Sequence, residues 1–221
     1  MPDTGTALTT GMEAYYDLRA QEYDHFYTGE GHYADRHRPG WFEDRAALEA
    51  WIREIPPARV LDVACGTGFL TQHLSGEVTA LDQSARMLEV AGERVPGAAL
   101  VQASGLALPF GEQEFDRLFT GHFYGHLREE QRRAFLREAA RVAKELVIVD
   151  AAKRDEFPFQ GVQVRPLLDG TTHEVYKRWY TGAGLAAELG GGDVLFDSGW
   201  FVAVSIPTAA IDLDAGRAVD A

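Results

Sequence analysis

V-L-D-V-A-C-G-T-G-F-L, residues 60–70, is the stretch of sequence from which the fold can be inferred. Its first residues are β-branched or aliphatic, which favours a buried strand, and Gly66 and Gly68 mark a tight turn after it. Apolar residues then return at helical spacing over residues 69–74, which predicts a helix. Because the two glycines have no Cβ atom, a ligand can approach this turn and accept hydrogen bonds from its backbone N–H groups.

A turn of this type can bind a dinucleotide or another ligand that contains ribose. A dinucleotide-binding turn has the pattern G-x-G-x-x-G, but Thr71 occupies its third glycine position here. The next strand-like run ends at Asp82, 20 residues after Asp62. A carboxylate at this separation can accept hydrogen bonds from a ribose. The pattern therefore predicts a ribose-containing ligand and does not require a pyrophosphate.

Strand and helix patterns alternate from residue 44 to residue 150, which predicts a parallel sheet with right-handed crossovers. The apolar run that ends at Asp150 is typical of a strand covered on both faces. Residues 151–170 are expected to be irregular, residues 172–180 alternate as a strand does, and residues 194–206 predict a hairpin. Helices are expected over residues 11–25, 44–55 and 129–142, and from Ser84, whose hydroxyl can cap a helix.

The run D-V-A-C-G-T-G at residues 62–68 resembles the first motif of class I S-adenosylmethionine-dependent methyltransferases. The later segments resemble small bacterial members of the type 11 and type 25 groups, in the same order along most of the chain. The resemblance implies an α/β, three-layer Rossmann-like fold with a mostly parallel seven-stranded sheet and a C-terminal antiparallel hairpin.

The same resemblance implies an enzyme that transfers a methyl group from S-adenosylmethionine to an oxygen, nitrogen or carbon atom of a small molecule. Two other classes stay open. One is an enzyme of this fold that uses the cofactor for a different reaction, and the other is a non-catalytic cofactor-binding module. Intact glycines and Asp82 argue against the module.

The resemblance also implies roles for individual residues. Asp62 and the backbone of Gly66 and Gly68 would hold the methionine part of the cofactor, and Asp82 would hold the ribose. The remaining cofactor contacts are expected at Gln83 and Met87 on the adenine side and at Ala64, Ala103, Ser104, Thr120, Tyr16 and Tyr23. Ser104 stands where the family often has an aspartate that binds the adenine amino group, so either its hydroxyl or the backbone would make that contact.

Four residues are candidates for the acceptor side of the site. His122 and His126 follow the fourth strand pattern at the edge where open α/β sheets bind ligands. An imidazole with its ordinary pKa of about 6.5 can take a proton from a hydroxyl acceptor. His173 and Tyr176 lie on the polar late strand. Each of these residues could instead have a structural role.

The chain is expected to be one domain with three parts. Residues 1–43 form an N-terminal helix and a possible lid over the site, residues 44–207 form the core, and residues 208–221 form a flexible tail. The histidines before residue 74 match no metal-ligand spacing, so no metal is expected.

Composition limits the partners. The chain of 221 residues has a formal net charge of −13, which disfavours nucleic acid and anionic membrane surfaces. No secretion signal or membrane-spanning run is recognisable, so a cytoplasmic location is expected. The sequence does not decide between a monomer and a homodimer.

Overall fold

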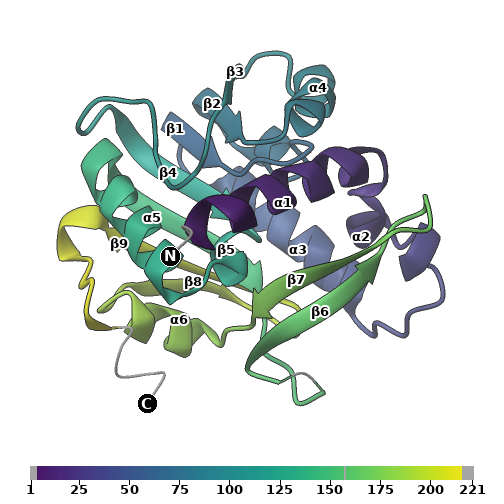
Figure 1. The fold of residues 1–221 in the computed structure, drawn as a ribbon. Helices are drawn as coiled ribbons and strands as arrows, with labels where there is room; N and C mark the ends of the chain where they lie inside the picture. The colour runs from purple at the N-terminus through teal and green to yellow at the C-terminus, as the bar shows by residue number, and fades with distance from the viewer. Residues whose placement is uncertain (1–3, 157, 216–221) are drawn as a thin grey trace.

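The computed structural model describes residues 4–156 and 158–215, and its central element is a seven-stranded sheet of order β3-β2-β1-β4-β5-β9-β8 (Figure 1). The first five strands in this order pair in parallel, and β9 and β8 are antiparallel additions. The strands are β1 (Ala58–Val63), β2 (Gly76–Asp82), β3 (Ala99–Gln102), β4 (Phe115–Gly121), β5 (Ala143–Ala151), β8 (Asp193–Asp197) and β9 (Phe201–Pro207). The predicted fold class is confirmed.

Helices cover both faces of the sheet. On one face α3 packs with Leu48 and Ile52, and on the other α5 and α6 pack with residues such as Phe135 and Leu185. The bounds are α3 (Trp41–Glu54), α4 (Ala85–Arg94), α5 (Glu129–Val142) and α6 (Gly182–Glu188). Neighbouring strand residues alternate between the two cores, which is why the strands read as continuous apolar runs.

The predicted helix after the glycine turn is wrong. Residues 64–75 form turns and one short 3-10 helix, η3 (Thr71–His73). This segment must return along the length of β1 before β2 begins, and six strand residues rise about 20 Å. An α-helix over all of 64–75 would rise about 18 Å and leave no residues for the turns at its ends. Turns and a 3-10 helix, which rise more per residue than an α-helix, cover the distance instead.

Residues 151–170 are not irregular throughout, as the sequence had suggested. They contain β6 (Gln160–Pro166), which pairs antiparallel with β7 (Thr172–Arg178) in a separate two-stranded sheet. The expectation failed because β6 carries few apolar residues, and Val162 and Val164 are exposed. Pairing with β7 stabilises it as a strand, and only the tertiary structure provides that partner.

The N-terminal part of the chain lies on the same side of the molecule as the β6–β7 hairpin (Figure 1). It consists of α1 (Thr4–Arg19), η1 (Ala20–Glu22), α2 (His25–Thr28) and η2 (Gly31–Tyr33). Tyr15 of α1 packs with Leu167 and Val175 of the hairpin region in a small separate core. Glu22 also accepts a hydrogen bond from the backbone N–H of Leu168. The N-terminal segment and the hairpin therefore support each other.

The beginning of the expected tail is packed rather than free. Thr208 is buried and donates a hydrogen bond to the carbonyl of Ala143, and Ile211 and Leu213 pack against the core. The packing is explained by the apolar cluster formed by β5, β9 and α5, which lies next to the chain where it leaves β9. Residues 216–221 lie outside the described residues.

A buried ion-pair group joins β7 to the helices below the sheet. Glu188 of α6 pairs with Arg132 of α5 and with Arg178 of β7, and Tyr124 donates a hydrogen bond to Glu188. Both Glu188 and Arg178 are almost completely buried. Removing one partner of such a group leaves buried charge without compensation.

Glu188→Gln is expected to lower the free energy of unfolding by about 3–5 kcal/mol, because two buried guanidinium groups lose their shared carboxylate. Urea denaturation measures this change. Glu89→Gln, which breaks an exposed pair with Arg86, is the control and should leave the midpoint unchanged. Equal midpoints for the two variants would show that the buried group does not stabilise the fold.

Candidate functional site

Two cavities lie side by side at the carboxyl ends of the parallel strands. The smaller, of about 210 Å³, is lined by the ends of β2 and β4 and by residues such as Gly66, Asp82 and Ser104. The larger, of about 450 Å³, lies under the N-terminal segment and the hairpin. Four residues line both cavities: Tyr16, Tyr23, His122 and His126. The site therefore has two chambers that meet at two phenols and two imidazoles, all four of them predicted from the sequence as site residues.

Asp82 organises the smaller cavity. One of its carboxylate oxygens accepts a hydrogen bond of 2.9 Å from the N–H of Gly66, and the other accepts one of 2.9 Å from the N–H of Ser84. The glycine turn and the start of α4 are thereby fixed to the end of β2. Burial raises the pKa of Asp82 to about 6, so at neutral pH this wall of the cavity carries a negative charge.

Two non-glycine residues at the site have backbone angles in the left-handed region. Ala64, after β1, has φ of 58° and His122, after β4, has φ of 57°. Such angles are uncommon outside glycine and concentrate at functional sites. Both residues line the smaller cavity, and the hydrogen bond from His122 N–H to the carbonyl of Val149 holds one of them in place.

Asp62 lies deeper than Asp82. Its carboxylate accepts a 2.6 Å hydrogen bond from the Thr71 hydroxyl, and burial raises its pKa to about 7. It lines a small separate hollow beneath Tyr23 and not the two main cavities. Thr71 thus has a definite function at the position where a dinucleotide-binding turn would have glycine.

His122 has one free ring nitrogen at the boundary between the chambers. Its Nδ1 lies 4.0 Å from Asp150 Oδ1, while its Nε2 has no hydrogen-bond partner in the part of the chain that the structure describes. Burial, opposed by Asp150 and aided by the nearby cations Lys177 and Arg165, lowers the pKa of His122 to about 4. The ring is therefore neutral at pH 7, whereas an exposed imidazole with a pKa of about 6.5 would be partly charged.

Asp150 is itself held tightly. Its carboxylate accepts hydrogen bonds from the N–H groups of Gly125 and Ala151 and pairs with the buried ammonium group of Lys177. This arrangement fixes the end of β5 to η4 (Tyr124–His126) and β7. The sequence analysis did not select Asp150, although its place at the carboxyl end of a buried strand matches those of Asp62 and Asp82 and could have indicated it.

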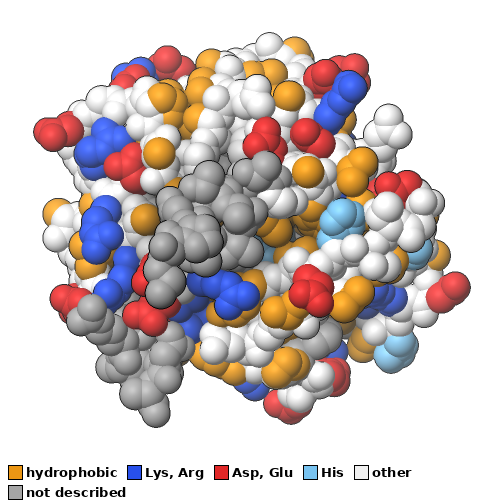
Figure 2. All heavy atoms as spheres, in the orientation of Figure 1, with side chains coloured by type: hydrophobic (Ala, Val, Ile, Leu, Met, Phe, Trp, Pro, Cys, Tyr) orange, Lys and Arg blue, Asp and Glu red, His pale blue; other side chains and the backbone are white. Residues whose placement is uncertain are grey.

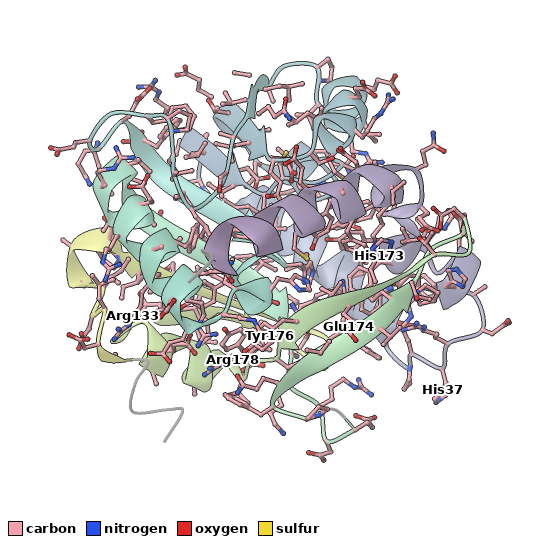
Figure 3. All side chains as sticks on the ribbon, viewed as in Figure 1. His37, Arg133, His173, Glu174, Tyr176 and Arg178 are labelled. Carbon is pink, nitrogen blue, oxygen red and sulfur yellow. The ribbon has the colours of Figure 1, made fainter. Side chains whose placement is uncertain are left out.

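The other three acceptor-side candidates differ in position. His126 Nδ1 donates a 2.7 Å hydrogen bond to the carbonyl of Tyr176, and burial lowers its pKa well below the ordinary value, so this ring is neutral and has a structural bond. Tyr176 lines the smaller cavity, but its hydroxyl donates to Gln160. His173 lines neither cavity; its ring packs at a tilt against Tyr15, nearer the start of β7 than Tyr176 (Figure 3).

The structure brings together part of the predicted cofactor set. Gln83 and Ser104 line the smaller cavity with Ala64, Gly66 and Asp82. Five predicted cofactor residues line neither main cavity: Asp62, Gly68, Met87, Ala103 and Thr120. Met87 is fully buried because α4 turns this side chain toward the core, and the Thr120 hydroxyl is occupied by a hydrogen bond to the carbonyl of Val63. In the place of Met87, the unpredicted Leu106 and Phe123 supply apolar cavity wall.

Side chains of the N-terminal segment fasten it to the glycine turn and to α4. The Asp24 carboxylate pairs with Arg94 and accepts a 2.6 Å hydrogen bond from the Thr67 hydroxyl. Ser84 donates a hydrogen bond to Asp17. Tyr23 lies so close to the turn that a Cβ atom at Gly66 would be 3.3 Å from its ring. On the face in Figure 2, hydrophobic side chains and a histidine are visible in the depression between α1 and β7.

In residues 4–156 and 158–215, no three His, Cys, Asp or Glu side chains gather as a metal site would require. No helix within these ranges has both the length and the apolar composition needed to cross a bilayer.

The fold and the site define an α/β enzyme-type domain with a ribose-compatible turn. A family model described as a methyltransferase domain matches residues 60–145. The chain is 34% identical over 118 residues to a demethylmenaquinone methyltransferase of Thermotoga maritima, and this alignment covers 50% of this chain and 51% of the relative. It is 40% identical over 101 residues to dTDP-3-amino-3,6-dideoxy-alpha-D-glucopyranose N,N-dimethyltransferase of Streptomyces fradiae. That alignment covers 43% of this chain and 37% of the relative. The alignments thus span about half the length of these curated relatives or less.

Among solved structures, the DhpI-SAM-HEP complex is similar over nearly the whole chain. The TM-score is 0.68 at 26% sequence identity, with 94% of this chain and 100% of the other covered. Residues 60–145 therefore match a methyltransferase domain, and nearly the whole chain shares the fold of the DhpI-SAM-HEP complex.

Asp24→Ala is expected to loosen the N-terminal segment, because Arg94 and Thr67 lose a partly buried carboxylate partner. Loss of such charge-assisted bonds costs about 1–3 kcal/mol, so amides of residues 25–33 should exchange with deuterium about tenfold faster or more. Amides of β1 and β4 should not change, and Asp116→Ala, at an exposed pair with Lys144, is the control. Unchanged exchange in residues 25–33 would show that Asp24 does not hold the segment.

Proposed function

We propose that this chain transfers a methyl group from S-adenosylmethionine to a nucleophilic atom of a small molecule. The observation that carries the proposal is the pair of chambers that meet at Tyr16, Tyr23, His122 and His126. The smaller chamber has the features the cofactor requires, and the larger is available to an acceptor. The transferred methyl group would pass at the boundary between them.

The residues of the smaller chamber fit the cofactor by their chemistry. Asp82 is a buried carboxylate on the wall and can accept hydrogen bonds from ribose hydroxyls. Gly66 leaves the turn open to close approach, and Leu106 and Phe123 form apolar wall suited to adenine. Ser104 lines the same chamber, where either its hydroxyl or its backbone would contact the adenine. Asp62 lines the adjoining hollow together with Ala64 and Cys65 of the turn.

The cofactor supplies a methyl group already activated by its positively charged sulfur. In the transfer, the acceptor atom would form a bond to the methyl carbon as the sulfur–methyl bond breaks. The two electrons of the broken bond would stay on sulfur. The protein must place the acceptor in line with this bond. Tyr16 and Tyr23 line the boundary, and burial raises the pKa of Tyr16 to about 12, so its phenol is neutral at pH 7.

For a hydroxyl acceptor, His122 is the group that would receive the proton. Its Nδ1 faces Asp150, so the Nδ1–H form of the ring leaves a lone pair on Nε2, the nitrogen without a described partner. Burial keeps the ring neutral and thus ready to accept a proton as the methyl group arrives. His126 would position β7 through Tyr176 and does not itself need to react.

Cofactor binding tests the smaller chamber. S-adenosylhomocysteine should bind measurably by calorimetry and NAD should not, since Thr71 replaces the third glycine and bonds to Asp62. Asp82→Asn should weaken binding by about 1–3 kcal/mol. Because protonated Asp82 is a poorer acceptor and its pKa is raised to about 6, wild-type affinity should fall as pH decreases through 6, whereas the Asn variant should lack this dependence. Tighter binding of NAD than of S-adenosylhomocysteine would contradict the proposal.

His122→Asn tests proton transfer, and asparagine suits the positive φ at this position. With a hydroxyl acceptor, kcat should fall about 10²–10⁴-fold. A base must be unprotonated, so wild-type kcat should stay level near neutral pH and decline only as pH approaches the lowered pKa of about 4, not near 6.5. His173→Asn, outside both cavities, is the matched control. Equal kcat for His122→Asn and wild type would limit His122 to a structural role.

A further inference from the structure

The larger chamber differs from the rest of the molecule in its charge. The whole chain has a formal net charge of −13, yet the chamber is lined by Arg19, Arg36, Arg38, Arg165 and Lys177 and by a single carboxylate, Glu22. Glu22 already accepts a backbone hydrogen bond from Leu168. Lys177 is paired with Asp150. The arginines therefore give this chamber an excess of positive charge.

Arg19 is the strongest indication of a missing anion. Its side chain is 5% exposed, and its hydrogen bonds go to the hydroxyls of Tyr15, at 2.8 Å, and Tyr33, at 3.2 Å. No carboxylate of the described residues lies within ion-pair distance of it. A neutral phenol oxygen can accept a hydrogen bond but cannot neutralise a guanidinium group. A buried charge without a counter-charge is costly, which makes this group a receptor for a negatively charged ligand.

Arg165 brings a second guanidinium group to the same chamber from β6. Its hydrogen-bond partner is the side-chain amide oxygen of Gln163, at 3.1 Å, and again no described carboxylate pairs with it. The charge of Arg165 lowers the pKa of both His122 and His126, so it acts on the boundary where the two chambers meet. Arg19 comes from the N-terminal segment and Arg165 from the hairpin, so the two elements approach a ligand from different sides.

Arg38 extends the positive charge toward the opening. It donates a 2.7 Å hydrogen bond to the carbonyl of Phe26 and lies 4.1 Å from the centre of the Trp41 ring, which fixes its position. His37 lies beyond it at the outer edge of the molecule (Figure 3). The positive charges of the arginines between this rim and Arg19 would attract an anion into the chamber.

We propose that the methyl acceptor is a small acid, whose carboxylate or phosphoryl group is held by Arg19 and Arg165 while its nucleophilic atom faces His122. This inference rests on the proposed function, which it deepens by naming the acceptor's chemical class. Guanidinium groups bind both carboxylate and phosphoryl oxygens through paired N–H donors, so the shared feature is an oxyanion. Neutral and cationic molecules of similar size should be poor acceptors.

The oxyanion site is tested first in the cofactor-free chain, so its outcome does not depend on methyl transfer. Inorganic phosphate and, separately, acetate are titrated while thermal unfolding is followed, with sodium chloride at equal ionic strength as reference. We expect at least one of these anions to raise the unfolding temperature more than chloride does. A greater effect of phosphate assigns a phosphoryl acceptor, and a greater effect of acetate assigns a carboxylate. No effect beyond that of chloride would overturn the inference.

Variants then locate the site. Arg165→Gln, a partly exposed position that should fold normally, is expected to raise the half-saturating anion concentration about tenfold or more, and Arg19→Gln to do the same. Arg59→Gln, with the same change of charge at the exposed opposite end of the sheet, is the matched control. Anion binding unchanged in Arg165→Gln would overturn the assignment. Anion binding without S-adenosylhomocysteine binding would instead overturn the proposed function and leave the oxyanion site standing.

Discussion

The Asp82 carboxylate makes the contact on which the site depends. Its two oxygens accept hydrogen bonds from Gly66 in the turn after β1 and from Ser84 at the start of α4. Because β1 and β2 are parallel neighbours, their carboxyl ends meet at one edge of the sheet, and this one side chain connects them. Its burial has an electrostatic cost, visible in its raised pKa, and a cofactor with hydroxyl groups would offset part of that cost.

The rest of the site is built on this edge by elements that are not part of the central sheet. The N-terminal segment is fixed to the turn through Asp24 and to α4 through Asp17. The β6–β7 hairpin is fixed to α5 and α6 by the buried Glu188 group and to β5 by the pair of Lys177 and Asp150. Together they enclose a second chamber next to the first. In the proposed enzyme the sheet edge would hold the cofactor, and the two added elements would select the acceptor.

Much of the fold could be predicted because its signals are local. Period and composition indicated the five parallel strands and α3, α4 and α5, and Ser84 caps α4 as expected, accepting a hydrogen bond from the N–H of Met87. The C-terminal antiparallel hairpin, formed by β8 and β9, was expected from its own pattern and from the family resemblance and is confirmed. The helix predicted after the glycine turn is absent because the segment is too short to return along β1 as a helix, although its apolar residues have helical spacing. The strand β6 was not predicted because it is stabilised by pairing with β7, and its own residues carry little strand pattern.

By itself, the sequence determined the sheet, the turn, and the residues that end each parallel strand, since each is specified by neighbours along the chain. It also indicated Tyr16, Tyr23, His122 and His126 as site residues, and the structure brings all four to one boundary. Only the tertiary structure decided that His122 is neutral and that Arg19 and Arg165 share a chamber. Burial and the gathering of charge depend on residues far apart in the chain, and no local pattern records how these pack together.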